Sequence, residues 1–412
     1  MLGFALKFTD NYLTMSNKRI YLKRGKEESL LRRHPWIFSG AIARADGDPE
    51  EGEVVDVFTS SGDFIARGHC QIGSIAVRVL TFERAEEIDS KWWQARIAEA
   101  LAVREAMGLA QSEQTTCYRL VHGEGDGLPG LVIDIYGTTA VVQCHSVGMY
   151  LSREEIAEAL RINFGDRLTA IYDKSSQTLP YNADLDAVDG YLWGQSSEGD
   201  GEVLENGNRF HVDWVKGQKT GFFIDQRENR ALVGHYARGR RLLNTFCYTG
   251  GFSIYGLAGG AKEVVSVDSS ELAVSLTDKN VELNFGDSAP HRSAAMDTFD
   301  FLSTTRKGEF DMIILDPPAF AKHHKVLGNA LQGYKRLNAR ALEKIAPGGI
   351  LFTFSCSQAV SKEQFRTTVF SAAAIAGRRV RILHQLTQPA DHPINIYHPE
   401  GEYLKGLVLF VE

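Results

Sequence analysis

Short apolar runs and helix-forming segments alternate from about residue 205 onward, and this alternation constrains the fold more than any other feature of the sequence. The predicted strands cover residues 241–244, 263–268, 311–316 and 350–354, and the predicted helices cover the apolar segment up to 257, 271–284 and 334–345. Strands that alternate with helices indicate βαβ units. Residues 205–412 are therefore predicted to form an α/β domain with a doubly wound, Rossmann-like parallel sheet.

The residues before 205 divide into two smaller parts. From 17 to 85, short apolar runs are separated by turns rich in Gly, Ser and Asp, which is typical of a small barrel-like β domain. Residues 86–200 begin with a helix, because apolar residues recur at helical spacing between Trp92 and Met107, and continue with strand-forming runs. We interpret this second part as a β-rich linking domain. A chain of 412 residues is long enough for three such domains.

The composition is that of a soluble globular protein. Hydrophobic residues make up 43% and charged residues 24% of the chain, and no apolar stretch is long enough to cross a bilayer, so no membrane partner is expected. Five cysteines without paired or metal-like spacing argue against a disulfide framework and against a zinc site. They indicate a reducing, cytoplasmic location, and no bound metal is predicted.

The first residues do not read as a secretory peptide, because Lys7 and Asp10 interrupt their apolar character and no small-residue cleavage signal follows. Met15 begins a more typical opening. Residues 1–14 are therefore predicted to be a disordered extension or a mis-assigned start.

The net charge of −7 alone argues against a nucleic-acid binder, but the charges are unevenly distributed. Between Lys18 and His34 there are seven basic and two acidic residues, and Arg32 and Arg33 are adjacent within this segment. Phosphate binding depends on such a local field more than on the total charge. Both a nucleic-acid contact and an ordinary solvated basic surface are compatible with this pattern.

A glycine-containing turn follows the first predicted strand of the α/β domain, with the sequence Phe246-Cys247-Tyr248-Thr249-Gly250-Gly251. Adjacent glycines at a strand-to-helix turn let a ligand approach the backbone closely, with the helix N–H groups facing it. The turn lacks the G-x-G-x-x-G spacing of dinucleotide-binding folds, which disfavours a nicotinamide cofactor.

Two acids extend this candidate cofactor site. Asp268 ends the second predicted strand, where a carboxylate can bind both hydroxyls of a ribose. The alternative is that Asp268 caps the next helix, because Glu271 stands at capping-box spacing from it. Asp297 lies near the next strand end, where it can contact an adenine amino group. Together with the glycine turn, these acids predict a site for S-adenosylmethionine (SAM).

The segment 219–227 precedes the first strand of the α/β domain and includes Asp225, Gln226 and Arg227. We predict that it closes over the methionine end of the cofactor. Its Phe222-Phe223 pair has an equally good alternative, which is packing in the core.

Two polar residues stand where the two central predicted strands end. Asp316 follows an apolar run and begins the turn Asp316-Pro317-Pro318, and Cys356 lies just beyond the strand 350–354. The carboxyl ends of parallel strands face the ligand crevice. We therefore expect the acid and the thiol to lie together, beside a rigid proline loop that holds the polar edge of a substrate base.

Two methyl-transfer reactions are compatible with this pair. Methylation of an exocyclic amine needs only a carbonyl and a carboxylate, usually with an aromatic residue directly after the prolines, where this chain has Ala319 and then Phe320. Methylation of cytosine C5 needs a thiolate that adds to C6 while an acid protonates N3. In that case Cys356 is the nucleophile and Asp316 is the acid. For Cys356 the alternative is an inert, buried cysteine.

Several longer motifs occur in one order along the chain. They are Ser29-Leu30-Leu31-Arg32-Arg33-His34-Pro35-Trp36-Ile37-Phe38-Ser39-Gly40, Arg119-Leu120-Val121-His122-Gly123-Glu124-Gly125-Asp126-Gly127-Leu128-Pro129-Gly130, Thr220-Gly221-Phe222-Phe223-Ile224-Asp225-Gln226-Arg227, Tyr248-Thr249-Gly250-Gly251-Phe252, Asp316-Pro317-Pro318, Ser355-Cys356-Ser357 and Asp391-His392-Pro393. In these motifs the chain resembles the ribosomal RNA large-subunit methyltransferase I family, over nearly its whole length from about residue 17.

The resemblance implies a PUA domain over 17–85 that contacts RNA, a linking domain over 86–200, and a class I SAM-dependent methyltransferase domain over 205–412. It also implies methylation of cytosine C5 in 23S ribosomal RNA, naked or within a large-subunit particle, with Cys356 as nucleophile and Asp316 as its acidic partner. The alternatives are methylation of an exocyclic amine of a ribosomal RNA base and a non-catalytic RNA-binding factor that retains the fold. The oligomeric state stays open, with a homodimer as one alternative.

Overall fold

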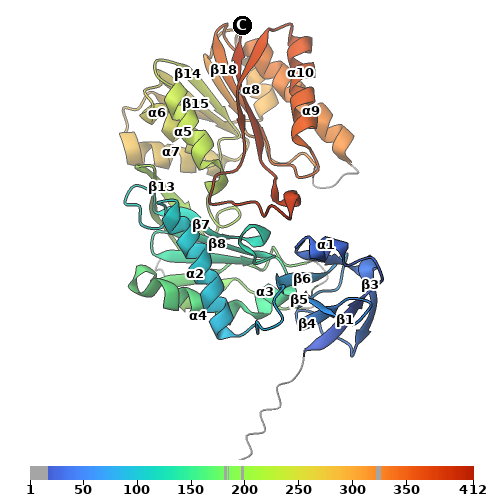
Figure 1. The fold of residues 1–412 in the computed structure, drawn as a ribbon. Helices are drawn as coiled ribbons and strands as arrows, with labels where there is room; N and C mark the ends of the chain where they lie inside the picture. The colour runs from blue at the N-terminus through green and yellow to red at the C-terminus, as the bar shows by residue number, and fades with distance from the viewer. Residues whose placement is uncertain (1–16, 181–182, 184, 196–198, 322–325) are drawn as a thin grey trace, which may run out of the picture.

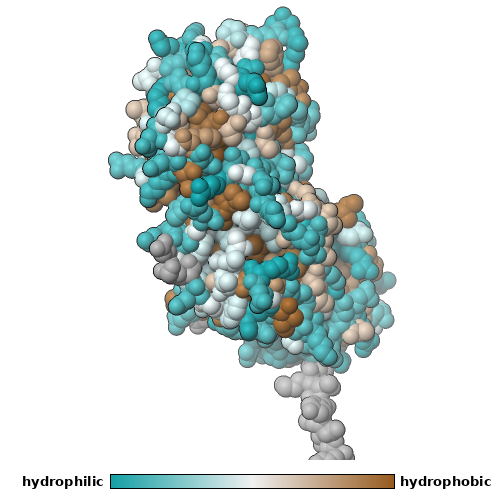
Figure 2. Space-filling model, turned by 90° about the vertical axis from the view of Figure 1, so that its left-hand side faces the viewer, coloured by the Kyte–Doolittle hydropathy of each residue, from teal (hydrophilic) through white to brown (hydrophobic). Residues whose placement is uncertain are grey.

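The computed structural model describes residues 17–180, 183, 185–195, 199–321 and 326–412, so that residues 1–14, the predicted extension, lie outside the described residues. The chain forms three large sheets, with the C-terminal sheet above the middle sheet and the N-terminal sheet beside the middle one (Figure 1). The space-filling view shows two lobes with a mostly hydrophilic surface, on which apolar residues form small patches (Figure 2).

The N-terminal domain is a small, six-stranded sheet with the strand order β2-β6-β5-β4-β1-β3. Its elements are β1 (Lys18–Leu22), α1 (Glu28–Leu31), β2 (Trp36–Phe38), β3 (Ile42–Asp46), β4 (Val54–Phe58), β5 (Phe64–Cys70) and β6 (Ile75–Thr81). Alternate residues of the strands, such as Ile20 and Leu22 or Val55 and Val57, are buried in one cluster, because strand side chains point to opposite faces in turn. The predicted barrel-like β domain is confirmed.

The middle domain has a five-stranded sheet with the order β11-β10-β9-β8-β7. Its elements are α2 (Ser90–Ala106), β7 (Cys117–His122), β8 (Leu131–Tyr136), β9 (Thr139–Cys144), α3 (Val147–Leu151), α4 (Arg153–Phe164), β10 (Ala170–Asp173) and β11 (Gly190–Gly194). The helix α2 begins after Asp89, whose side chain accepts a hydrogen bond from the Trp92 backbone N–H. Trp92, Trp93 and Ile97 then pack in one core with residues of α4 and the sheet.

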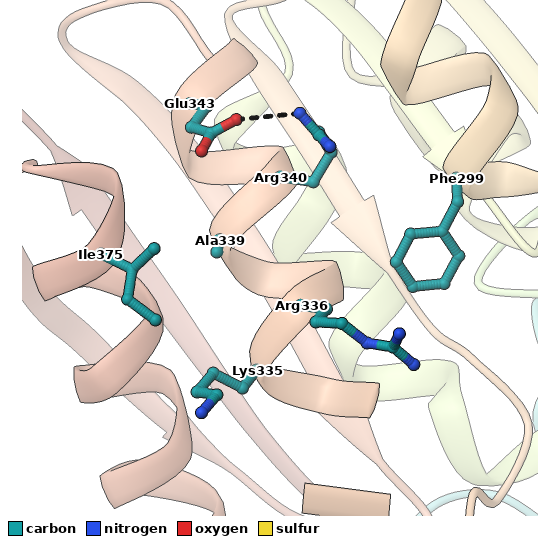
Figure 3. A pocket seen from close by; sticks show the side chains of 7 residues that line it. All are labelled: Phe299, Lys335, Arg336, Ala339, Arg340, Glu343 and Ile375. Carbon is teal, nitrogen blue, oxygen red and sulfur yellow. Dashed lines mark hydrogen bonds and ion pairs between the residues drawn. The ribbon is translucent and has the colours of Figure 1, made fainter. Parts of the chain in front are cut away.

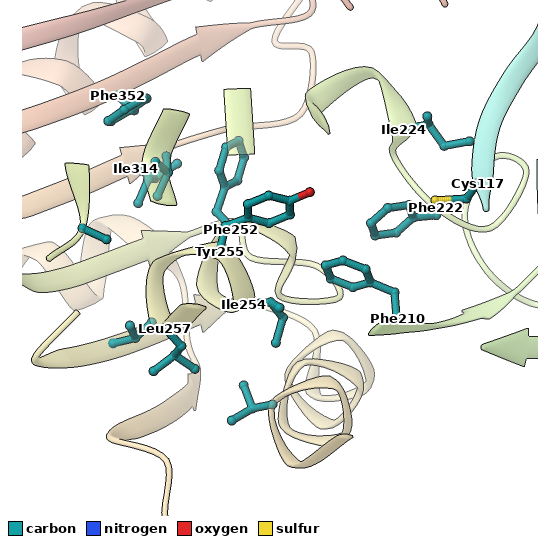
Figure 4. Packing of buried hydrophobic residues seen from close by; sticks show 14 of the residues in the cluster. Cys117, Phe210, Phe222, Ile224, Phe252, Ile254, Tyr255, Leu257, Ile314 and Phe352 are labelled. Atoms are coloured by element: carbon teal, nitrogen blue, oxygen red, sulfur yellow. The ribbon is translucent and has the colours of Figure 1, made fainter. Parts of the chain in front are cut away.

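A hairpin formed by β12 (Asp200–Glu205) and β13 (Asn208–Asp213) joins the middle and C-terminal domains. On one side, the Thr116 backbone N–H donates to the Leu204 carbonyl at 2.8 Å. On the other side, the Arg209 N–H donates to Asn284. Buried residues on both sides of this junction form a single cluster (Figure 4), which includes Cys117, Phe210, Phe222, Phe252 and Phe352. The linking domain and the C-terminal domain therefore share a core.

The C-terminal domain has a seven-stranded sheet with the order β16-β15-β14-β17-β18-β20-β19. The strands are β14 (Arg241–Thr245), β15 (Glu263–Asp268), β16 (His291–Ala295), β17 (Met312–Leu315), β18 (Gly349–Ser355), β19 (Val380–Leu386) and β20 (Lys405–Val411). The helices are α5 (Arg227–Tyr236), α6 (Gly251–Ala258), α7 (Glu271–Phe285), α8 (Thr298–Thr304), α9 (Leu327–Lys344) and α10 (Lys362–Ala376). Among the described residues no helix is both long enough and apolar enough to cross a membrane.

Both faces of this sheet are covered by helices, as the predicted doubly wound fold requires. Met312 and Ile314 of β17 pack in the cluster that contains residues of α5 and α6, whereas Ile313 and Leu315 pack in the cluster that contains residues of α9 and α10. The α/β fold class is confirmed.

The sheet is not parallel throughout, however. Strands β14 to β18 are parallel, but β20 runs antiparallel to β18, and β19 runs antiparallel to β20. A strand end was expected near Asp297, where β16 lies, but β19 and β20 were not predicted, and with them the antiparallel edge of the sheet was missed.

Candidate active site

Asp316 and Cys356 lie at the carboxyl ends of β17 and β18, which are adjacent and parallel. Leu315 pairs with Thr353 in the register of the two strands, so Asp316 is level with Phe354, and Cys356 lies two residues further along the chain. The structure therefore brings the predicted acid and the predicted thiol to one edge of the sheet. In the turn that follows Asp316, Pro317 is buried and Pro318 is exposed.

The carboxyl group of Asp316 is held in a poorly solvated position. Its Oδ1 accepts a hydrogen bond from Gln226 Nε2 at 3.1 Å. Burial raises the pKa of Asp316 from 3.8 to about 7, and the negative charge of Asp225 contributes to the same rise. At neutral pH a large fraction of this carboxyl therefore carries a proton, as the acid of a proton-transfer step must.

The thiol of Cys356 is partly buried, and its pKa is raised to about 12. Burial is the largest cause, and the charges of Asp316 and Asp225 act in the same direction, whereas Lys405 acts against them. The thiolate is consequently disfavoured while Asp316 is ionised. Protonation of Asp316 removes one of the two negative charges that oppose it.

Lys405 is a site residue that the sequence analysis did not assign. It begins β20 opposite Ser355 of β18, and its side chain is 5% exposed. Its Nζ donates to the Ser357 carbonyl at 2.6 Å, directly after the thiol. Burial lowers the pKa of Lys405 to about 8. The apolar run from Gly406 to Val411 was the available signal, since it marks a strand whose first residue is charged.

The predicted cofactor turn, from Phe246 to Gly251, contains several residues with positive φ angles. Phe246, Tyr248 and Gly250 have φ angles of 55°, 47° and 80°. The Tyr248 carbonyl accepts a hydrogen bond from Thr277 Oγ1 at 2.8 Å. A Cβ at Gly250 would lie 2.7 Å from Thr277 Cγ2. The chain itself therefore requires glycine at 250, through a positive φ and a close neighbour, whereas the prediction invoked only the approach of a ligand.

The carboxylate of Asp268 orders the same turn. Its Oδ2 accepts from the Tyr248 N–H at 3.1 Å, and its Oδ1 accepts from the Ser270 N–H at 3.0 Å. The helix α7 is capped by Ser270, whose Oγ accepts from the Ala273 N–H. The cap alternative for Asp268 is therefore wrong, because the capping side chain stands two residues later.

Asp297 is the N-cap of α8. Its Oδ1 accepts hydrogen bonds from the backbone N–H groups of Phe299 at 2.8 Å and Asp300 at 3.2 Å. Its second carboxylate oxygen takes no part in this cap, so a ligand can still be bound there.

Some side chains of the segment 219–227 lie at the candidate site, and others lie in the protein interior. Phe222 is buried against Phe210, but Phe223 packs edge-on against Tyr248 of the cofactor turn, with ring centroids 5.1 Å apart. Phe222 therefore takes the core-packing alternative, whereas Phe223 lies against the predicted cofactor turn, and closure of this segment over the cofactor stays a prediction.

The three polar residues at the end of this segment also differ from one another. Asp225 Oδ2 accepts from the Tyr403 hydroxyl at 2.7 Å, while its buried Oδ1 has no hydrogen-bond partner among the described residues. Gln226 contacts Asp316, as described above. The guanidinium of Arg227 is bound to Asp391 at 2.7 and 3.1 Å, and both side chains are buried. The structure thus gives Arg227 an ion pair in place of the predicted cofactor contact.

Arg32 and Arg33 lie on the surface of the N-terminal domain. The Arg32 side chain is 77% exposed, and Arg33, with a φ of 60°, places its guanidinium over the Phe82 ring. The same domain has a cavity of about 330 Å³ lined by residues that include Lys26, Trp36 and Phe38. Exposed cations beside aromatic rings are suited to contacts with phosphates and bases.

A separate cavity of about 430 Å³ lies between α8, α9 and α10 (Figure 3). Its walls include Phe299, Lys335, Arg336 and Ile375, and Arg340 is paired with Glu343 at its edge. None of its lining residues is among those at the strand ends, so this cavity is distinct from the candidate active site.

Comparison with known proteins agrees with this geometry. Residues 119–395 match a family model described as S-adenosylmethionine-dependent methyltransferase, and residues 20–82 match a PUA-like domain. A solved structure of a SAM-dependent methyltransferase from Streptococcus mutans covers 95% of this chain and 99% of its own, with a TM-score of 0.80 at 24% identity. Another, complexed with SAH, has a TM-score of 0.81. The chain is a SAM-dependent methyltransferase with an N-terminal PUA-like domain.

The curated relatives define the family more closely. A ribosomal RNA large subunit methyltransferase I from Tolumonas auensis is 45% identical over 394 residues, which cover 95% of this chain and 98% of the relative. Its counterpart from an Escherichia coli O139:H28 strain is 40% identical, covering 94% of this chain and 98% of the relative. The chain belongs to the ribosomal RNA large subunit methyltransferase I family.

Proposed function

We propose that this protein methylates C5 of a cytosine in large-subunit ribosomal RNA, with Cys356 as nucleophile and Asp316 as proton donor. The observation that carries the proposal is the position of a carboxyl with a pKa of about 7 beside a thiol, at the ends of two adjacent strands. The relatives, which are named ribosomal RNA large subunit methyltransferase I, support ribosomal RNA of the large subunit as the substrate class.

In the proposed reaction the Cys356 thiolate adds to C6 of the cytosine and forms an S–C6 bond. The electron pair of the C5–C6 double bond forms a C4–C5 double bond, and the pair of the C4–N3 double bond moves to N3, which accepts the proton of Asp316. The resulting enamine makes C5 nucleophilic. After C5 has been methylated, a base removes the proton from C5, the C5–C6 double bond forms again, the thiolate leaves C6, and the N3 proton returns to Asp316. Lys405 stabilises the thiolate by its charge, since it acts to lower the pKa of Cys356.

SAM supplies the methyl group, which is electrophilic because it is bound to a sulfonium. The cofactor turn from Phe246 to Gly251 and the carboxylates of Asp268 and Asp297 are proposed to hold its nucleoside part. For its methionine part we propose Asp225, with Gln226 beside it. The buried Oδ1 of Asp225, which has no hydrogen-bond partner among the described residues, is suited to accept from an ammonium group.

The N-terminal domain is proposed to contact the RNA. Arg32 and Arg33 are exposed in this domain, which also has the cavity lined by Lys26, Trp36 and Phe38. Pro317 and Pro318 follow the acid directly and are proposed to shape the pocket for the target base. A base that is paired in its substrate must leave the stack to reach this pocket, so single-stranded or distorted RNA is the expected context.

The competing reaction is methylation of an exocyclic amine at the same loop. It needs no thiolate, and the raised pKa of Cys356, about 12, is the observation that favours it. Against it, the ring of the partly buried Phe320 already packs against the Tyr334 ring, with centroids 4.6 Å apart, and this contact competes with stacking on a base.

Replacement of Cys356 by Ala separates the two reactions. We expect the variant to bind SAM with unchanged affinity and to lose methyl transfer to large-subunit ribosomal RNA. A matched control is Cys70→Ala, which removes another partly exposed cysteine in the N-terminal domain. Normal turnover by Cys356→Ala would leave the amine reaction standing. Absence of methyl transfer by the wild-type enzyme to any ribosomal RNA, naked or assembled, would favour a non-catalytic binding factor.

A further inference from the structure

Two histidines and a glutamate meet where the N-terminal domain touches the C-terminal tail. His34 comes from the turn between α1 and β2, and His398 and Glu400 come from the loop between β19 and β20, which includes η6 (Pro399–Gly401). Figure 1 shows this loop descending from the C-terminal sheet toward α1. Their potential ligand atoms all lie within 4.8 Å of one another.

His398 is a buried residue of this cluster whose ring makes no hydrogen bond to the described residues. Its side chain is 3% exposed, yet neither Nδ1 nor Nε2 has a hydrogen-bond partner within the described part of the chain. A buried polar group without a hydrogen-bond partner lowers the stability of the fold, and a ligand that binds to this group can offset that cost. The ring is also fixed in place, because it packs against Trp36 with centroids 4.3 Å apart and its backbone N–H donates to the Asn395 carbonyl at 2.8 Å.

Glu400 lies between the two rings. One of its carboxylate oxygens is 3.6 Å from His34 Nε2, and the other is 3.8 Å from His398 Nε2. A Zn²⁺ ion lies about 2.0–2.2 Å from its nitrogen and oxygen ligands, which places tetrahedral ligands about 3.4 Å apart. The separations of 3.6 and 3.8 Å are a few tenths of an ångström longer than this spacing, and no pair of ligand atoms in the cluster is more than 4.8 Å apart, so the three side chains must move closer together when the ion binds.

We propose that His34, His398 and Glu400 form a binding site for a divalent cation that prefers imidazole ligands, of the Zn²⁺ class. Two imidazoles and one carboxylate are a ligand set that such ions accept. Glu400 is 52% exposed, so the site opens to solvent, from which the ion enters and a water molecule completes its coordination.

The surroundings of His34 fit this role. The Trp36 N–H donates to its Nδ1 at 3.2 Å, and the Trp36 carbonyl lies 3.4 Å from the same atom. When Nε2 is bound to a metal, Nδ1 carries the proton, so it gives up the bond from the N–H and donates to that carbonyl, which is a common second contact of a metal-bound histidine. The five cysteines led us to expect no zinc site, but this site uses none of them and joins residues 364 positions apart.

A bound ion would fix the N-terminal domain to the rest of the molecule. Trp36 also donates from Nε1 to Glu124 of the middle domain at 2.8 Å, and Asn395 donates to the Glu124 carbonyl. The cluster therefore lies where elements of all three domains converge. By holding this junction, the ion would set the position of the RNA-contacting domain relative to the strand ends.

The test is a Zn²⁺ titration of the full chain against a chromogenic chelator, after treatment with EDTA and its removal. Wild-type protein and the His235→Asn control, which removes an exposed histidine of α5, should bind one Zn²⁺ per chain with equal affinity. His398→Phe keeps a ring against Trp36, and Glu400→Gln changes a half-exposed side chain, so both should fold normally. Each should lower the affinity at least about tenfold, because loss of an outer-sphere partner alone costs that much.

Cobalt substitution identifies the ligands. Co²⁺ bound by the wild-type protein should give visible d–d bands without a thiolate-to-metal charge-transfer band, and these bands should be lost in His398→Phe. Failure of the wild-type protein to bind Zn²⁺, equal affinity in Glu400→Gln, or a charge-transfer band that disappears in Cys70→Ala would each overturn the proposal.

Discussion

Replacement of Asp316 by Asn should stabilise the cofactor-free protein, and the gain should grow with pH. Burial raises the pKa of Asp316 in the folded chain from 3.8 to about 7. At low pH the carboxyl is protonated in both the folded and the unfolded chain. Between about pH 4 and 7 the unfolded chain ionises first, so the free energy of unfolding of the wild-type protein falls as pH rises.

The size of this effect follows from the two pKa values. A pKa raised from 3.8 to about 7 corresponds to about 4 kcal/mol at a pH above both values, because a tenfold change in the protonation equilibrium is about 1.4 kcal/mol. Since the side chain is partly exposed, about 2–4 kcal/mol is expected. The assay is urea unfolding followed by circular dichroism, with Asp316→Asn compared with the wild-type protein at about pH 5 and about pH 8.

Asp311→Asn is a matched control, for which the expected change in the free energy of unfolding has the opposite sign. Asp311 is bound to Arg241 at 2.8 and 2.9 Å, and this contact lowers the pKa of the carboxyl. Its stabilising effect is present at neutral pH and is lost in acid, so Asp311→Asn should be less stable than the wild-type protein at about pH 8. An Asp316→Asn variant that is no more stable at about pH 8 than the wild-type protein, or whose gain does not change with pH, would refute the reasoning.

Three other changes test neighbouring parts of the structure. Lys405→Met should slow iodoacetamide alkylation of Cys356 by about tenfold at about pH 7, where Lys405, with a pKa of about 8, is mostly charged and favours the thiolate; an unchanged rate would remove Lys405 from this role. Asp391→Ala should lower the free energy of unfolding by about 3–5 kcal/mol, because it leaves Arg227 buried without its partner, whereas Glu343→Ala at the surface pair with Arg340 should cost at most about 1 kcal/mol. Gly250→Ala should cost about 1–3 kcal/mol, because of its φ of 80° and the contact with Thr277; denaturant unfolding that shows no loss would contradict this account of the turn.

The sequence was sufficient to predict the position of Asp316 and Cys356, for a physical reason. Each residue follows an apolar run that can only be a buried strand, and the carboxyl ends of adjacent parallel strands must meet at one edge. The placement therefore needed no knowledge of the intervening helix, whose start was predicted at residue 334, although α9 begins at Leu327.

The features that were missed depend on contacts between distant parts of the chain. Lys405 reaches the site because β20 lies antiparallel beside β18, and the apolar run that marks β20 as a strand does not show which strand it pairs with. Arg227 lies in a motif that suggested a cofactor contact, but its partner Asp391 is 164 residues away. Similarly, sequence spacing of metal ligands cannot reveal a cluster such as His34, His398 and Glu400.

For Asp268, the sequence did not show which of two neighbouring side chains caps the helix α7. Asp268 stands at capping-box spacing from Glu271, but Ser270 lies closer to the first turn of α7, and its side chain is the N-cap. The carboxylate two residues earlier is then left to order the cofactor turn through the Tyr248 N–H. Local motifs therefore identified the right segment but could not choose between two competent side chains.

The most direct test of the central claim is a search for the covalent intermediate. Wild-type enzyme, SAM and large-subunit ribosomal RNA containing 5-fluorocytosine should give a stable protein–RNA adduct, because fluorine at C5 cannot be removed as a proton is. Peptide mapping by mass spectrometry should place the nucleotide on Cys356, and Cys356→Ala should give no adduct. Methylation of unsubstituted RNA without any adduct on fluorinated RNA, or an adduct on another residue, would contradict Cys356 as the nucleophile.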